Sequence, residues 1–318
     1  METLGLPQRA HTRQAISPLH LLVLIRRALW SAVDHDCFNM AQATAYSAVF
    51  ALFPALIVAA AVIALVPDTL PLRYQLAVFF DRVLPGSVSL LFETYFTASP
   101  NNTHSARVLV GAVIVSITGA ASVIGTLMEG LRRAHDLPAD TWTFWQRRRK
   151  SFALIPLCLL PLAVASILVV FGHIITLWLM QYVPTNLDTV AYAIASILRW
   201  TVALAGTASI IAFIYHLGTP TALSWRRSLP GAVFATAMWM LTTITFGWYV
   251  TNFANYTVVY GSIGAAIALL VWLYITALSV LCGAELNAQI FPPPPQPSVI
   301  APAGQALASH PTPAQQVE

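Results

Sequence analysis

One cation inside a long apolar stretch offers the clearest site for chemistry in this sequence. The stretch runs from Thr189 to Leu217, is long enough to cross a lipid bilayer and carries Arg199 near its middle. A cation at the centre of a spanning helix costs roughly 3 kcal/mol to insert, so it must face protein, water or an anionic partner rather than lipid. We therefore predict that Arg199 binds an anionic substrate or ion, with a structural clamp between helices as the alternative.

Four further polar residues are candidates for the same substrate or ion pathway. His173 is expected at a depth similar to that of Arg199, and Tyr46 interrupts the first apolar stretch. Asn252 and Asn255 precede the last apolar stretch, where they are placed to line a vestibule. Hydrogen bonding between helices explains these residues as well, and this alternative stays open.

A carboxylate at the end of the last apolar stretch is expected to pair with a cation from another helix end. The carboxylate is Glu285, and the candidate cations are Arg132, Arg133 and Arg226. We prefer this helix-end pairing to a role for Glu285 in proton coupling.

The sequence contains no set of residues expected to catalyse a reaction, bind a metal or hold a cofactor. Glu129, Asp136 and Asp140 are close in sequence but lie beside a dense run of cations and have no metal-ligand spacing with histidine. The three cysteines form neither a metal motif nor a disulfide framework; they are Cys37, Cys158 and Cys282. We therefore predict that the chain is not an enzyme.

Composition shows that the elements positioning these residues are membrane-spanning. The 318 residues are 58% hydrophobic and only 9% charged, whereas soluble domains are about one quarter charged. The mean hydropathy is +0.72. The net charge of +4 comes from basic residues beside the apolar stretches, as orientation in a membrane requires, so it does not imply nucleic acid as a partner.

The predicted fold is an all-α, polytopic membrane helix bundle with six transmembrane helices. A polar segment, 1–17, precedes the membrane domain, 18–290, and a disordered Pro-rich tail, 291–318, follows it. The predicted spans are approximately 43–66, 108–127, 151–180, 189–217, 230–250 and 260–286.

Shorter helices are expected outside the spans. Leu22, Ile25, Leu29 and Val33 recur at helical spacing before the first span, which predicts an N-terminal interfacial helix. The long first extracytoplasmic loop contains two short helical patterns, at 72–84 and 88–96.

Prolines predict breaks in two spans. Pro54 lies in the first span, and Pro156 and Pro161 lie in the third. Each proline removes one backbone donor, so kinks are expected. A kink at Pro54 has either a purely structural role or a role in a gate. Pro230 is expected in the first turn of the fifth span.

The distribution of cations predicts the orientation. Twelve of the sixteen lysines and arginines fall on the side of the two chain ends, three fall on the other side, and Arg199 lies within a span. The positive-inside rule then places both termini in the cytoplasm. The run from Arg147 to Lys150 is chiefly a topology signal, and binding of anionic lipid at the cytoplasmic face is its second meaning.

Two segments resemble a known family. The first is ATAYSAVFALFP, from Ala43 to Pro54. The second runs from Asn252 to Ile290 and contains YGSIG, WLY and GAELN at 260–264, 272–274 and 283–287. Together with the order and spacing of the spans, these motifs resemble the YihY and BrkB family of bacterial inner-membrane proteins.

The resemblance implies a six-span inner-membrane protein associated with envelope functions, serum resistance or export of lipid-related or small anionic compounds. An older ribonuclease label, also implied by the resemblance, lacks supporting residues in this chain. Our leading hypothesis is a permease or exporter of an anionic solute or lipid-related compound through a cavity near Arg199. The alternative is a non-transporting envelope-integrity or scaffold protein. The partners expected for this chain are the lipid bilayer, anionic lipid at the cytoplasmic face and a small anionic or lipid substrate. The oligomeric state is left open.

Overall fold

A computed structural model describes residues 18–65, 103–138, 141–159, 188–219, 224–252 and 262–292. Within these ranges the regular secondary structure is helical, as predicted. The helices are α1 (Pro18–Asp34), α2 (Cys37–Leu65), α5 (Thr103–Ala134), α7 (Asp188–Gly218), α8 (Trp225–Asn252) and α10 (Ser262–Ile290), together with a helical stretch at 144–159.

Five of the described helices are long and apolar enough to cross a membrane. They contain the candidate spans Cys37–Ala59, Leu109–Ala134, Ala193–Gly218, Trp225–Val250 and Ala266–Ile290. These correspond to the predicted first, second, fourth, fifth and sixth spans. Only the beginning of the predicted third span is described, within the helix at 144–159.

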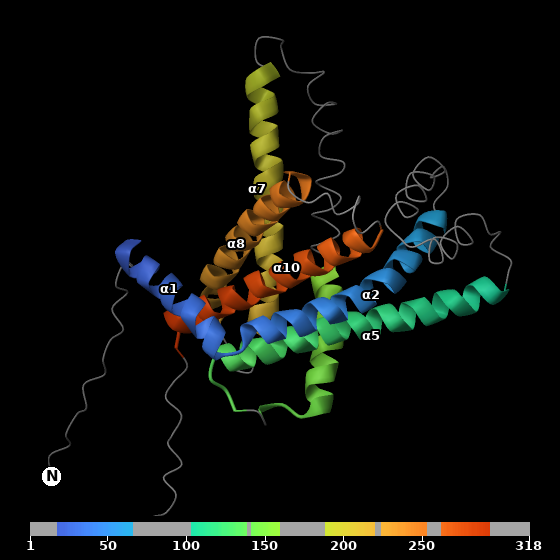
Figure 1. Cartoon of the computed structure of the whole chain (residues 1–318), viewed down its shortest axis with the longest axis horizontal. Coiled ribbons are helices and arrows are strands. Elements are labelled where there is room, and N and C mark those ends of the chain that lie inside the picture. Colours follow the sequence, from blue (N-terminus) through green and yellow to red (C-terminus); the bar gives the residue numbers. More distant parts are fainter. Residues whose placement is uncertain are drawn as a thin grey trace, which may run out of the picture.

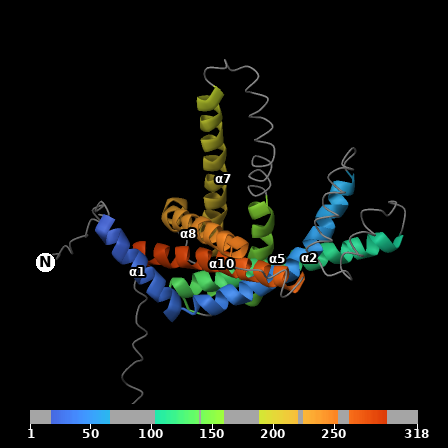
Figure 2. The ribbon, with the colours of Figure 1, turned by 45° about the horizontal axis from the view of Figure 1, so that its top comes forward.

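The helices α2, α5 and α10 form the centre of the structure. Figures 1 and 2 show α2 and α5 side by side with α10 against them, while α1 lies against the C-terminal part of α10. The helix α8 packs on α10 and α7. Both views show α7 projecting away from the other helices. Its C-terminal half is buried at Ala212 and Tyr215, whereas Ile197 and Leu198 in its N-terminal half are exposed.

Small residues allow the helices to approach closely. A Cβ atom added to Gly119 of α5 would lie 2.8 Å from the Cβ of Ala51 of α2. A Cβ added to Gly283 of α10 would lie 2.5 Å from the carbonyl oxygen of Gly231 of α8. Such contacts replace the hydrophobic driving force that is missing between helices in lipid.

The helix ends differ from the predicted span ends. The helix α2 begins at Cys37, six residues before the predicted start at 43. The helix α10 continues to Ile290, so Glu285 lies inside it rather than at its end. Consecutive prolines from Pro292 supply no backbone donors and explain why α10 stops there.

The predicted position of Pro230 in the first helical turn is wrong. The helix α8 already begins at Trp225, so Pro230 lies inside it. The backbone N–H of Arg227 donates a hydrogen bond to the carbonyl of Ser224 at 2.8 Å. This bond forms a turn at the start of the helix, before the proline. One lost intrahelical bond is tolerated because α8 is held by its contacts with α10 and α7.

The helix α1 presents an apolar stripe outward. Its buried residues are Leu24, Ala28 and Ala32, of which Leu24 and Ala28 form a cluster with Leu286 of α10. Leu22 and Val33, from the stripe that predicted this helix, are exposed. A helix with one apolar face on protein and another outward is suited to the membrane interface.

Of the predicted kink residues, Pro54 lies inside α2, whose ribbon changes direction along its length in Figure 2. Pro156 lies within the helix at 144–159. Pro161 and the short helices predicted at 72–84 and 88–96 lie outside the described residues.

The contact between α8 and α10 predicts a strong effect of one added methyl group. We expect Gly283→Ala to lower the thermal stability of the detergent-purified protein by about 2 kcal/mol, because the new Cβ meets backbone and cannot be accommodated by a side-chain rotation. The matched control is Gly111→Ala, where no atom lies within 4 Å of the added Cβ. This control should be neutral or slightly stabilising, since alanine favours helix. Equal melting temperatures for Gly283→Ala and the wild type would contradict the packing described here.

Candidate functional site

Six helix ends meet at one polar region, which we call the cation-rich end. It comprises the turn between α1 and α2, the C-terminal ends of α5, α7 and α10, and the N-terminal end of α8. The α1–α2 turn contacts α10 through His35 and Glu285, and it contacts α5 through Asp36 and Arg133. Its cations are Arg132, Arg133, Arg147, Arg226 and Arg227.

Two aspartates with left-handed backbone form the turns at this end. Asp36, with φ of 61°, separates α1 from α2, and Asp136, with φ of 50°, follows α5. The N–H of Asp136 bonds to the carbonyl of Arg133 at 2.9 Å, and the N–H of Leu137 bonds to that of Arg132 at 3.1 Å. This pair of bonds is a Schellman cap, in which an aspartate takes the place usually held by glycine. The caps direct both aspartates toward the same polar region.

Glu285 is the most deeply buried acid of the site. Its side chain has an exposed fraction of 0%. His35 Nδ1 lies 2.9 Å from Glu285 Oε1 and 3.1 Å from Oε2, and the thiol of Cys37 donates to Oε1 at 3.5 Å. A buried carboxylate needs such a partner, because removing its charge from water without one costs several kcal/mol.

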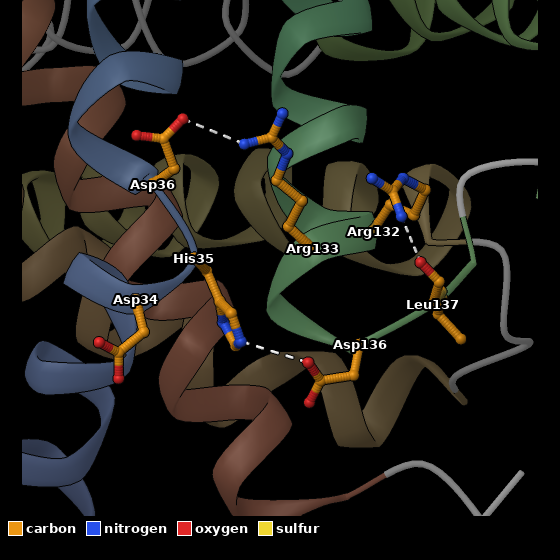
Figure 3. Close-up of a pocket in the computed structure, with 7 residues that line it drawn as sticks. All are labelled: Asp34, His35, Asp36, Arg132, Arg133, Asp136 and Leu137. Carbon is orange, nitrogen blue, oxygen red and sulfur yellow. Dashed lines mark hydrogen bonds and ion pairs between the residues drawn. The ribbon is translucent and has the colours of Figure 1, made fainter.

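His35 faces a second carboxylate on its other side. Its Nε2 lies 3.3 Å from Oδ1 of Asp136, whose side chain is 79% exposed (Figure 3). Ionised carboxylates only accept hydrogen bonds, so both contacts are satisfied together when His35 carries a proton on each ring nitrogen. The imidazole therefore joins an exposed acid to a buried one.

Guanidinium groups surround the neighbouring acids. Arg132 and Arg133 contact Glu129 at 2.7 and 3.4 Å, and Arg147 approaches the same carboxylate at 3.3 Å. Arg133 also pairs with Asp36 at 3.1 Å (Figure 3). An open cavity of about 360 Å³ lies among these groups and is lined by Asp34, His35, Asp36, Arg132, Arg133, Asp136 and Leu137.

Two buried polar side chains beside Glu285 keep atoms without a hydrogen-bond partner among the described residues. They are Nε2 of His135 and Nδ2 of Asn287. Nδ1 of His135 donates to the carbonyl of Leu131 at 2.9 Å. Burial lowers the pKa of His135, so the unfolded chain takes up this proton more readily, and the group disfavours the folded state as the pH falls below about 6.5.

The run of four cations divides into an inward and an outward pair. Arg147 pairs with Glu129, and Arg148 donates to the hydroxyl of Ser122 at 3.3 Å. Arg149 and Lys150 instead line an open cavity of about 590 Å³ with Trp142, over whose ring the Lys150 ammonium lies at 4.2 Å.

The structure describes three of the five predicted pathway residues, and no hydrogen bond or ion pair joins Arg199 to the other two described ones. Arg199 lies in the projecting N-terminal half of α7, 19 residues before Gly218, which corresponds to about 28 Å along the helix. Tyr46 is 62% exposed on α2 and contacts the ring of Phe50. Asn252 ends α8 and donates to the carbonyl of Trp248 at 2.8 Å. His173 and Asn255 lie outside the described residues.

The predicted pairing of Glu285 with Arg132 or Arg133 differs from the pairing in the structure. The residues do lie at one end of the structure, but Arg132 and Arg133 bond to acids near the surface. Glu285 instead bonds to His35, because α10 continues past Glu285 and buries it beside the α1–α2 turn. The sequence prediction missed His35. The sequence feature that could have indicated His35 is the polar pair His35-Asp36, which interrupts two helical patterns.

Nothing in the described ranges brings together three or more histidine, cysteine, aspartate or glutamate residues suited to hold a metal ion. The three cysteines are unpaired thiols.

Comparison with known proteins gives matches over most of the chain. Residues 28–292 match the family model described as virulence factor BrkB. The chain is 28% identical over 258 residues to the ribonuclease-like protein YfkH of Bacillus subtilis, covering 80% of this chain and 90% of that protein. It is 25% identical over 268 residues to the UPF0761 membrane protein PSHAa0171 of Pseudoalteromonas translucida, covering 82% and 83% of the two chains. No solved structure matches.

The buried pair of Glu285 and His35 predicts that replacing Glu285 destabilises the fold much more than replacing Asp36 at the same end. We expect Glu285→Ala to lower the free energy of unfolding by about 3 kcal/mol or more, because His35 loses its buried partner. Asp36→Asn is the matched control, since asparagine tolerates the left-handed backbone and only the half-exposed pair with Arg133 is lost. This control should cost less than about 1 kcal/mol. Denaturation in detergent micelles measures both, and equal losses would contradict the structural importance of Glu285.

Proposed function

Because this chain belongs to the BrkB family of membrane proteins, we propose that it moves an anionic solute or lipid-related compound across the bacterial inner membrane. The family match covers residues 28–292 and therefore includes all five described candidate spans. The matched relative from Pseudoalteromonas translucida is named only as a membrane protein. The ribonuclease-like name belongs to the relative from Bacillus subtilis, and we do not extend it to this chain.

The observation that carries the proposal is the position of Arg199. It is partly buried in the candidate span Ala193–Gly218, among the exposed apolar residues Ile197, Leu198 and Trp200. Across the part of the chain that the structure describes, no acidic side chain forms an ion pair with it. A cation held within a span without a protein counter-ion favours an anionic ligand.

We also propose that the cation-rich end faces the cytoplasm. The N-terminal end of α2 and the C-terminal end of α10 both lie there, which supports the same side for the two ends of the membrane domain. Cations concentrate at this end, as the positive-inside rule requires of cytoplasmic loops.

Anionic lipid is the partner that we propose for the outward pair, Arg149 and Lys150. Both line a cavity beside Trp142, and no acidic residue of the described ranges lines it. A cation next to an interfacial tryptophan suits the phosphate of a lipid headgroup.

The transport proposal predicts unequal effects of two Arg199 variants. In proteoliposomes, Arg199→Ala should reduce the flux of the transported anion by about tenfold or more, the effect of one lost charge-assisted hydrogen bond. Arg199→Lys should retain part of the flux because it keeps the charge. Thr201→Ala is the control, since its hydroxyl bonds only within α7 to the carbonyl of Ile197. If both Arg199 variants fold and transport like the wild type, the site proposal fails, whereas reduced stability without altered flux favours the scaffold alternative.

The divided cation run predicts selective lipid binding. Replacing Arg149 and Lys150 with alanine should weaken binding to vesicles containing phosphatidylglycerol by about 2 kcal/mol, or roughly 1 kcal/mol for each cation. Replacing Arg147 and Arg148 should affect stability more than lipid binding, because these side chains bond within the protein. Co-purified lipid, measured by mass spectrometry, distinguishes the two pairs. Equal lipid losses in both double variants would show that the run acts only through its total charge.

A further inference from the structure

We propose that Asp136, His35 and Glu285 form a proton-uptake relay from the solution at the cation-rich end to a carboxylate buried between helices. The coupling of this proton to anion movement rests on the proposed function, whereas proton uptake itself does not. Histidine and carboxylate chains of this kind carry protons in membrane pumps and transporters.

Exposure falls steadily along the three side chains. Asp136 is 79% exposed, His35 is 22% exposed and Glu285 is 0% exposed. The two steps measure 3.3 Å, from Asp136 Oδ1 to His35 Nε2, and 2.9 Å, from His35 Nδ1 to Glu285 Oε1. The step to Glu285 is a hydrogen bond of a length suited to proton transfer. The contact with Asp136 is an ion pair slightly longer than this range, so transfer there requires a small movement of the exposed Asp136 side chain or one bridging water. The geometry therefore leads in one direction, from water to the buried acid.

The imidazole can pass a proton because its two nitrogens face different acids. The N–H bond at Nδ1 of the protonated His35 breaks as an O–H bond forms on Glu285. The neutral ring keeps its proton at Nε2, so it turns about its bond to Cβ and takes the replacement proton at Nδ1 from the carboxyl of Asp136, which is replenished from solution. The net change is one proton added to Glu285, with His35 again protonated, so no further reactant is needed.

Other charged or titratable groups around Glu285 do not replace His35. Asp36, in the α1–α2 turn, pairs with Arg133 of α5. Cys37, the first residue of α2, donates a hydrogen bond from its thiol to Glu285. The C-terminal end of α5 contributes His135, whose free nitrogen is buried, and α10 itself contributes Cys282. From α7, the hydroxyl of Tyr215 donates to the carbonyl of Val280. Among the described residues, His35 is thus the basic side chain bonded to Glu285.

Proton uptake has a mechanical consequence at this position. The ion pair of His35 and Glu285 holds the α1–α2 turn against α10. A neutral Glu285 keeps a hydrogen bond but loses the charge attraction, so the turn is held less tightly. By contrast, Glu129 contacts three guanidinium groups and is expected to stay ionised. Glu285 is therefore the proton site, and Glu129 is a fixed structural charge.

Infrared difference spectroscopy of the full-length protein in nanodiscs tests the uptake step directly. A drop from about pH 8 to about pH 5 spans the titration range of histidine. We expect a new protonated-carboxyl band in the wild type that is absent from Glu285→Gln and retained in Glu129→Gln. A spectrum in which Glu285→Gln removes no band would overturn the proposal, because Glu285 would then not take up a proton.

A pH jump tests the route to Glu285. Asp136→Asn should slow the rise of the Glu285 band by about a hundredfold, the lower end of the effect of a positioned acid or base. The side chain is exposed, so this variant should fold normally. Asp34→Asn, which removes another acid from the same cavity, should leave the rate unchanged. Equal rates in wild type and Asp136→Asn would remove Asp136 from the relay.

Proteoliposome flux under an imposed pH gradient then tests coupling. The wild-type flux should depend on the gradient, and Glu285→Gln should lose this dependence. A Glu285 band in a protein without measurable transport would leave the proton site intact and reject the proposed function. Gradient-independent transport by the wild type would support the function and overturn the coupling.

Discussion

The buried carboxylate of Glu285 sets the strongest constraint on this structure. A charge with no contact to water is tolerated only with a partner at hydrogen-bonding distance, and His35 is that partner. Glu285 lies inside α10, five residues before the helix ends at Ile290, so no helix end supplies backbone groups to it. One imidazole in the turn between α1 and α2 therefore adds a polar contact with α10 to the apolar packing of Leu24 and Ala28 on Leu286.

Close helix packing supplies the dry environment in which this pair matters. Gly231 and Gly283 bring the backbones of α8 and α10 together, and Asn287 accepts a bond from the Gly231 N–H at 3.2 Å. Side chains larger than hydrogen at the two glycines would separate the helices and admit water. The motif GAELN thus combines the close contact, the buried acid and the amide within little more than one turn of one helix.

The structure separates two kinds of charge by their surroundings and by distance. The cation-rich end contains paired charges that connect helix ends, whereas Arg199 lies about 28 Å along α7 from that end among exposed apolar side chains. Under the proposed function, the region around Arg199 handles the anion and the cation-rich end takes up protons. The helices between them are the means by which one region would influence the other.

Composition and periodicity were sufficient to predict the all-helical membrane class, because apolar length and charge placement follow directly from the thickness and dielectric of a bilayer. They also brought out Arg199 and Glu285, whose charges are unusual beside apolar runs. The partner of Glu285 was not predictable in this way: His35 is 250 residues away in sequence, and only the packing of α1 and α2 on α10 brings it to 2.9 Å. Likewise, the four consecutive cations from Arg147 to Lys150 cannot be distinguished by a sequence pattern. The rotation of the helix at 144–159 against α5 decides that Arg147 and Arg148 face inward. Local sequence determined where charges occur, and tertiary contacts determined which charges meet, because such pairing depends on distances between helices that no local pattern encodes.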